Sequence, residues 1–269
     1  MRYRGGWPAA ARRPAFPLAR FPSSRADMTP TLSDAPAASS PAELIAPSFD
    51  RSRHAAPQVF EHLRELIVAM RIAPGTVLQR AELAALYGLS QTPIRDALIR
   101  LGEEGLVDIF PQHATVVSSI DVPLARQQLF LRRSIELEIV HRLASAPSAP
   151  LLARLADSIE LQRMHAAREN YVEFVHADEA FHKLMYDAAE VMDLWTLVRR
   201  QSGHLDRLRN LHVPIPGKTE RVLEQHAAIV AAIAAGNPEA AQEALRAHLS
   251  GTLSQVDEIR ARFGGFLKN

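Results

Sequence analysis

The sequence predicts a mainly α-helical fold in two parts: three short helices closed by a small β-hairpin, and then an all-α bundle of six helices. Three observations support this prediction. Apolar residues recur at helical spacing in nearly every segment from Gln58 onward. Two short runs rich in β-branched and aromatic residues flank a single turn at residues 111–114. Glycine and proline then divide the remaining chain into six periodic segments of helical length.

The composition of the 269-residue chain limits the classes of protein to consider. Apolar residues make up 47% of it, which is enough to bury a substantial core. The absence of cysteine excludes disulfides, leaves any metal ion to nitrogen and oxygen ligands, and fits a cytoplasmic location. No apolar run approaches the roughly 20 residues of a membrane span, so no membrane partner is expected. Because the net charge is only +1, a nucleic acid would have to meet a local basic surface.

Residues 1–53 differ in composition from the rest and are expected to form a disordered extension. Eight of the 18 prolines fall in the first 50 residues, and residues 1–53 hold eight arginines, no lysine and four acidic residues. Pro14 and Pro17 interrupt any apolar stretch that a secretory signal would need. Met28 is an alternative start, which would make residues 1–27 an upstream extension.

The first two helices follow this extension. The first begins near Gln58 and stops at Pro74-Gly75, and the second is short and closes at Gly88. Their apolar positions lie three or four residues apart, as one buried helix face requires. These positions are Val59, Leu63, Leu66, Ile67 and Met70 in the first helix, and Leu83 and Leu86 in the second.

The third helix and the hairpin complete the unit, residues 54–120. Ser90 is expected to cap the helix, which ends at Gly105 and carries Ile94, Ala97, Leu98 and Leu101 on one face. Residues 106–110 and 115–118 are expected to pair around the turn. Three helices and a hairpin in this order are typical of a winged helix-turn-helix, whose third helix enters the DNA major groove.

The start of that third helix carries the candidate DNA-binding residues. Ser90, Gln91 and Thr92 offer hydrogen-bonding side chains beside free backbone N–H groups, which suits a phosphate. Arg95, about one turn further on, can donate two hydrogen bonds to a guanine edge or to a phosphate. His113 lies at the tip of the hairpin, within reach of a minor groove or the DNA backbone. An ordinary helix cap would also read Ser-x-Thr-Pro, so the complete order of elements carries this interpretation.

In the order of their helices and strands and in the residues given below, residues 57–120 resemble the GntR family of bacterial regulators. The resemblance implies a homodimer that binds an inverted-repeat operator in double-stranded DNA. Three positions depart from the family: Gln91 replaces an arginine, Ala114 replaces a glycine, and Ala81 replaces a basic residue. In this chain Arg80 stands next to Ala81. Because Gln91 can still read adenine, we expect an altered operator sequence rather than lost binding. The loss of phosphate-directed cations should also flatten the salt dependence. The matching residues are Leu63-Arg64, Ile67, Pro74-Gly75-Thr76, Leu78, Glu82-Leu83-Ala84, Gly88-Leu89-Ser90, Thr92-Pro93-Ile94-Arg95, Ala97-Leu98, Leu101, Glu104-Gly105-Leu106-Val107 and Pro111.

The remainder of the chain, residues 121–264, is expected to form the six-helix bundle. Prolines and glycines mark most of the breaks between its periodic segments, and Pro238 stands at a helix start, where its missing N–H costs nothing. Six antiparallel helices leave room for an internal site. The segments cover residues 123–146, 150–168, 170–189, 191–212, 218–235 and 238–263.

Four residues of this part form a candidate metal site. Asp178 and His182 are four residues apart and therefore share one helix face. His226 and His248 lie on two later helices, each beside an apolar stripe. Three imidazoles and one carboxylate suit a divalent first-row metal. A lone histidine beside an apolar stripe is more often a core residue, and an Asp–His pair at this spacing is common on surfaces, so spacing alone leaves both interpretations open.

Residues 122–262 resemble the FCD ligand-binding domain of the FadR subfamily. In metal-dependent members the motif's aspartate and three histidines bind the ion, and the same four residues stand here. The resemblance therefore implies a divalent cation at this cluster, with zinc as the first expectation and nickel or manganese as alternatives. The matching features are Arg132-x3-Glu136, Asp178-x2-Phe181-His182, Glu224-Gln225-His226, Ile229, Ala232-Ile233, Gly236-Asn237 and Arg246-Ala247-His248-Leu249.

Two further residues are candidates for ligand binding. Arg132 corresponds to a pocket arginine of that domain, and a guanidinium beside a metal can hold a carboxylate from the opposite side. A salt bridge to Glu136, one helical turn away, is the alternative use of Arg132. His204, which follows Gly203, is the second candidate.

Three functional hypotheses follow. The first is a transcription regulator, not an enzyme, whose operator binding is modulated by a small organic acid bound at the metal site. The second is a metal-dependent hydrolase or lyase of helical-bundle type, for which the sequence offers no separate general base and no use for the amino-terminal unit. The third is a DNA-binding protein whose metal is purely structural.

Overall fold

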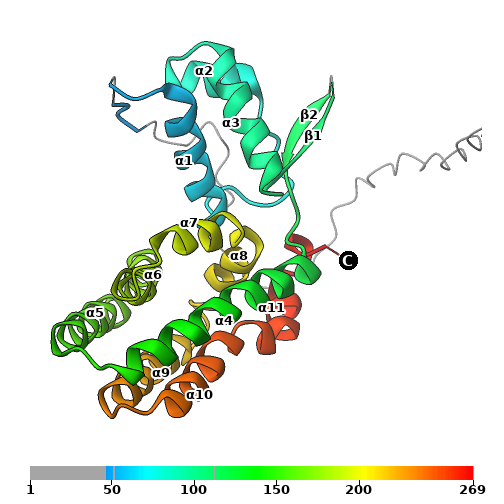
Figure 1. The fold of residues 1–269 in the computed structure, drawn as a ribbon. Coiled ribbons are helices and arrows are strands. Elements are labelled where there is room, and N and C mark those ends of the chain that lie inside the picture. The colour runs from blue at the N-terminus through cyan, green and yellow to red at the C-terminus, as the bar shows by residue number, and fades with distance from the viewer. Residues whose placement is uncertain (1–46, 51, 112, 269) are drawn as a thin grey trace, which may run out of the picture. The chain divides into compact units, whose positions relative to one another are not determined.

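The helices and strands of the amino-terminal unit follow the predicted order (Figure 1). The structure, a computed structural model, describes residues 47–50, 52–111 and 113–268. The predicted disordered extension, residues 1–53, therefore lies mostly outside the described residues. The elements are α1 (Ala55–Val68), α2 (Arg80–Tyr87), α3 (Gln91–Glu103), β1 (Val107–Phe110) and β2 (Ala114–Val117).

A small core holds this unit together. Leu63 and Ile67 of α1 pack with Ile94 and Leu98 of α3, and all four side chains are buried. β1 and β2 form an antiparallel hairpin in which Val107 lies opposite Val117. The core therefore fixes the third helix beside the hairpin, as a winged helix-turn-helix requires.

The rest of the described chain is helical. Helix α4 packs against α8 and α10, α5 packs against α6 and α9, and α9 packs against α10. The helices are α4 (Val122–Ser145), α5 (Ala149–Ala167), α6 (Tyr171–Ala188), α7 (Met192–Arg200), α8 (Gly203–His212), α9 (Lys218–Ala234), α10 (Pro238–Ser250) and α11 (Val256–Phe263), with short 3₁₀ turns η2 (Leu253–Gln255) and η3 (Gly264–Phe266). Among the described residues, no helix is both long and apolar enough to cross a membrane.

The predicted fold class is confirmed, but two of the six predicted bundle helices are interrupted. The segment 191–212 is two helices, α7 and α8, because α8 starts afresh at Gly203, where a Cβ atom would lie 2.8 Å from Cδ2 of Leu106. Segment 238–263 is α10, η2 and α11. Its buried positions keep helical spacing across both breaks, so periodicity could not reveal them. They are Leu245, Leu249, Leu253, Val256 and Ile259.

The chain end is tied to the link between the two parts. The N–H of Ile120 donates to the carbonyl of Phe266, and the N–H of Lys268 donates to the carbonyl of Ile120, each at 2.8 Å. Ile120 and Leu267 are both buried in the bundle core. This pairing anchors the segment that leads from β2 into α4.

Candidate nucleic-acid interface and metal centre

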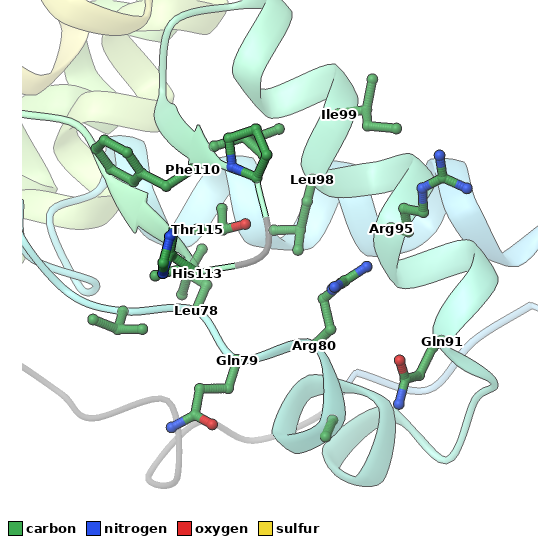
Figure 2. A pocket seen from close by; sticks show the side chains of 15 residues that line it. Leu78, Gln79, Arg80, Gln91, Arg95, Leu98, Ile99, Phe110, His113 and Thr115 are labelled. Carbon is green, nitrogen blue, oxygen red and sulfur yellow. The ribbon is translucent and has the colours of Figure 1, made fainter.

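A groove of about 750 Å³ lies between α3, the residues leading into α2, and the hairpin. Four of the six predicted DNA-binding residues, Arg80, Gln91, Arg95 and His113, line it. Figure 2 shows Arg80, Gln91 and Arg95 on one side of this groove and His113 on the hairpin side. All four side chains are exposed, so two arginines, a glutamine and a histidine offer hydrogen-bonding groups to one concave surface.

The other two predicted residues, Ser90 and Thr92, are exposed at the amino-terminal end of α3. Ser90 takes the N-cap position, but its side chain makes no capping hydrogen bond. The first N–H groups of a helix have no partner inside the helix. The start of α3 therefore has its hydroxyls and backbone donors available to a phosphate rather than committed to a cap.

Sequence reasoning missed the apolar part of the groove. Ile99 is 40% exposed and Phe110 is 52% exposed, and both line it beside the polar residues. Ile99 follows Gln91 and Arg95 at intervals of four, so it shares their helix face. An exposed isoleucine at that spacing was the signal that could have found it. Such side chains suit contact with a thymine methyl group.

The four predicted metal ligands come together inside the bundle. One ligand atom from each of Asp178, His182, His226 and His248 lies within 4.8 Å of the other three. Nε2 of His248 is 3.1 Å from Nε2 of His182 and 3.3 Å from Nε2 of His226. Nε2 of His226 is 3.6 Å from Oδ1 of Asp178. A tetrahedral zinc ion with bonds of about 2.0–2.2 Å holds its ligand atoms about 3.3–3.6 Å apart, so these three separations are close to those around a single ion.

Two buried residues orient the imidazole rings from behind. Nδ1 of His226 is hydrogen-bonded to Oε1 of Gln162 at 2.8 Å, and the Gln162 amide group donates to the carbonyl of Ala177. Nδ1 of His182 lies 2.9 Å from Oε2 of Glu136, although the two atoms are not aligned as a hydrogen bond. Both acceptors favour the tautomer with its proton on Nδ1, which turns the Nε2 lone pair of each ring toward the cluster.

The proton count at the cluster favours a cation. With protons on Nδ1 of His182 and His226, their two Nε2 atoms can only accept, and Nε2 of His248 has at most one proton to donate. At least one buried lone pair therefore needs a partner from outside the protein, which a cation or a water molecule can supply. Burial lowers the pKa of His226 to about 4, with a smaller contribution from Arg132, so the ring is in the neutral form that binds metals.

Asp178 is shared between the cluster and an arginine. Its Oδ1 faces His226, and its Oδ2 accepts a hydrogen bond of 2.9 Å from Nη1 of Arg209. Burial alone would raise the pKa of Asp178, but Arg209 and the neighbouring histidines hold it well below its usual range. The carboxylate is therefore ionised, as a metal ligand must be.

A small cavity of about 30 Å³ adjoins the cluster, and it is lined by Asp178, His248 and three cationic residues: Arg132, Arg209 and Lys218. Nε of Arg132 donates to Oε1 of Glu136 at 2.7 Å, so the predicted salt bridge is present. Within the described chain no hydrogen bond is recorded for Nη1 or Nη2 of Arg132. The two alternative uses of Arg132 are therefore compatible: one edge of the guanidinium is held by Glu136 while the other remains for an anion.

Comparisons with known proteins match both halves of the chain. Residues 55–117 match the model of bacterial regulatory proteins of the gntR family, and residues 128–251 match the FCD domain. A transcriptional regulator from an unstable DNA locus of Streptomyces ambofaciens is 33% identical over 203 residues, which cover 76% of this chain and 85% of that protein. The chain belongs to the GntR family.

Two more similarities agree with this assignment. The transcriptional repressor RspR of Escherichia coli K12 is 30% identical over 203 residues, covering 76% of the GntR-family chain and 89% of RspR. The solved structure of E. coli McbR/YncC matches with a TM-score of 0.66 at 19% identity, covering 77% of this chain and 98% of that one. The last similarity supports the fold alone. The relatives are named as transcription regulators rather than enzymes.

The structure places His204, the second predicted ligand-binding residue, away from the metal cluster. Its Nδ1 accepts from the backbone N–H of Asp121 at 3.0 Å and from Arg207 at 2.9 Å. Arg207, which is fully buried, also donates to the carbonyl of Ser118 at 2.7 Å. In this GntR-family regulator, His204 and Arg207 therefore hold the segment between the winged unit and α4, and His204 is not among the residues that line the cavity.

A chain of ion pairs runs from the metal cluster to the winged unit. Nη2 of Arg209 and Nη2 of Arg199 both donate to Oε1 of Glu179, at 2.7 and 2.8 Å. Nη2 of Arg64 in α1 donates to the carbonyl of Arg199, and Nε of Arg64 donates to Oε2 of Glu104 at 2.7 Å. Glu104 is the C-cap of α3. Salt bridges and one hydrogen bond to a backbone carbonyl thus connect Asp178 to the end of α3.

Proposed function

We propose that this GntR-family transcription regulator binds an inverted-repeat operator as a homodimer, and that a small carboxylate bound with a divalent metal ion in the FCD domain changes its affinity for the operator. The carrying observation is the convergence of three imidazole Nε2 atoms beside the ionised Asp178. These groups form a ready-made cation site, and the adjoining cavity has an excess of positive charge.

The proposed metal ligands are Asp178, His182, His226 and His248. Zinc is the first expectation, with nickel or manganese as alternatives, because nitrogen and oxygen ligands suit all three. When bound, the ion supplies a Lewis-acid position for one oxygen of the effector. The chain itself supplies Arg132, whose Nη atoms receive the carboxylate, and Glu136, which keeps the guanidinium in place.

The ion-pair chain offers a route from effector to DNA. An anion near Arg132 and Arg209 competes with Asp178 and Glu179 for the same guanidinium donors. Loosening Glu179 leaves Arg199 with Asp206 as its remaining carboxylate partner. The carbonyl of Arg199 accepts from Arg64, which also bonds to the C-cap of α3. The proposal is that effector binding repositions α3 relative to its counterpart in the dimer, and that this lowers operator affinity, as in repression relieved by an inducer.

At the DNA, Arg95 and Gln91 are proposed to read base edges, with Arg80, Ser90, Thr92 and His113 on the backbone. Arg80 and Arg95 supply the local positive charge that the near-neutral chain lacks overall. Gln91 in place of arginine favours adenine at the corresponding operator position.

The test compares a cluster variant with a matched control. His226→Ala removes a ligand, and His176→Ala removes an exposed histidine two residues before Asp178. We expect the wild type and His176→Ala to purify with stoichiometric zinc, nickel or manganese, and His226→Ala to lose it. With a labelled fragment of the promoter upstream of the gene, carboxylic acids should release wild-type protein but not His226→Ala, while both bind DNA without acid. An equal acid response in both proteins would refute metal-linked sensing.

A second pair of variants tests the route. Glu179→Gln weakens its bonds to Arg199 and Arg209, whereas Glu173→Gln alters an exposed glutamate on the same helix. Metal content and acid binding should be unchanged in both proteins. Only Glu179→Gln should show weakened release from DNA. Full acid-dependent release by Glu179→Gln would show that the signal takes another path.

A further inference from the structure

Lys218 is a buried cation without a recorded partner. It is the first residue of α9, and it is only 5% exposed. Among the described residues, no carboxylate lies within salt-bridge distance of its ammonium group, and no acceptor is recorded for it. Lysine is almost never this buried unless it is paired. Burial lowers the pKa of Lys218 to about 8, and the nearby charge of Asp178 offsets only part of this effect.

The other two cations of the cavity already have anionic partners. Arg132 is paired with Glu136, and Arg209 is paired with Asp178 and Glu179. The cavity wall itself presents three cations against the single carboxylate of Asp178. Lys218 is thus the one cation of the wall without a salt-bridge partner among the described residues, and Asp178, which acts on it from a longer distance, is already bound by Arg209.

The ammonium group of Lys218 lies against Gly251, close in sequence to His248. Nζ of Lys218 lies 3.1 Å from the position that a Cβ atom on Gly251 would take. Gly251 is the C-cap of α10, three residues after His248. Lys218 lines the cavity together with Asp178 and His248, so the ammonium group and two of the proposed metal ligands border the same small space.

We propose that the effector is a dicarboxylate whose first carboxylate binds at the metal and Arg132 and whose second carboxylate binds Lys218. This inference rests on the proposed function and adds to it the class of ligand. A monocarboxylate would leave the buried ammonium unpaired, whereas a second carboxylate offsets the cost of burying it. The cavity of about 30 Å³ has to widen to admit any of these acids, and the compact aliphatic dicarboxylates need the least widening.

The experiment uses acids that differ by one charge. Succinate replaces the terminal methyl of butyrate with a carboxylate, and glutarate does the same for valerate. Binding to zinc-loaded full-length protein is measured by calorimetry for the wild type, Lys218→Met, Lys218→Arg and the control Lys183→Met, which alters an exposed lysine of α6. The wild type should bind each dicarboxylate at least about tenfold more tightly than the matching monocarboxylate, which is the usual effect of a charged hydrogen bond. Lys218→Met should lose this preference, while Lys218→Arg and Lys183→Met keep it.

A stability measurement separates a binding role from a structural one. Without ligand, Lys218→Met should melt no lower than the wild type, because it removes an unpaired buried charge. Two results would overturn the inference and leave the proposed function standing. In the first, the wild type shows no preference for the dicarboxylates. In the second, Lys218→Met retains the preference, or binds both acids of a pair more weakly to the same extent. If His226→Ala keeps the preference, the metal-linked function fails while the Lys218 site stands. If neither class of acid binds the wild type, both fail.

Discussion

Replacing Glu136 with glutamine tests the idea that the cluster is held in place from behind. Glu136 is completely buried, accepts a 2.7 Å hydrogen bond from Arg132 and lies 2.9 Å from Nδ1 of His182. The amide keeps the shape of the side chain but removes its charge, leaving the buried Arg132 without its partner. Breaking a buried pair in this way costs about 3 kcal/mol. For a domain of about 200 residues, a loss of that size lowers Tm by roughly 6–12 °C.

The same substitution should weaken metal binding, because residues that orient a ligand typically contribute about 10- to 100-fold to affinity. Thermal unfolding of the metal-free protein and zinc competition against a chromophoric chelator measure the two effects separately. Glu138→Gln is the matched control, since Glu138 is exposed two residues further along α4. The reasoning would be refuted if Glu136→Gln bound zinc as tightly as Glu138→Gln, or if both variants melted at the same temperature.

Three further predictions concern other parts of the molecule. Burial, with Arg207 nearby, lowers the pKa of His204 to about 4, so below pH 6.5 the unfolded chain takes up a proton that the folded chain does not. The free energy of unfolding should therefore fall as the pH decreases from 6.5 to 4. Urea titrations at each pH should show a less steep fall for His204→Asn. Gly203→Ala brings a Cβ atom against Leu106 and should destabilise the protein by about 1–3 kcal/mol, whereas Gly264→Ala, with open space around it, should not. Arg95→Ala should weaken operator binding by about 1–3 kcal/mol in fluorescence anisotropy without changing metal content, and equal binding by both proteins would remove Arg95 from the interface.

Local patterns predicted most of the elements because these depend on short-range spacing, whereas the set of four proposed ligands followed from the resemblance to the FCD domain. Asp178 and His182 share a helix turn, so their common face follows from the sequence. The residues of other helices that contact the cluster could not be predicted from the sequence in this way. Gln162 takes a core position of α5, three residues after Ile159, and a polar residue at that position was the available signal. Its contact with His226 crosses 64 positions of sequence. Only the packing of α5 against α9 reveals that contact.

The misplacement of His204 has a similar cause. Continuous periodicity through residues 191–212 suggested one helix, which would carry His204 toward the bundle interior with its neighbours. The break before Gly203 restarts the helix against Leu106, and His204 then meets Asp121 at the junction. A close backbone approach to another part of the chain decides this break, and no local propensity encodes it.

Asp178 contacts both the imidazole cluster and the chain of ion pairs. One of its oxygens faces the imidazole cluster, and the other is bound by Arg209, so a metal ion and the ion-pair chain draw on the same carboxylate. A cation on Oδ1 withdraws charge from Oδ2 and weakens its attraction for Arg209, while an anion in the cavity offers Arg209 a replacement partner. The metal and the acid therefore act on Arg209 in the same direction. Because Glu179 joins Arg209 to Arg199 and thereby to Arg64, we expect the proposed response at α3 to be largest when metal and acid are both bound.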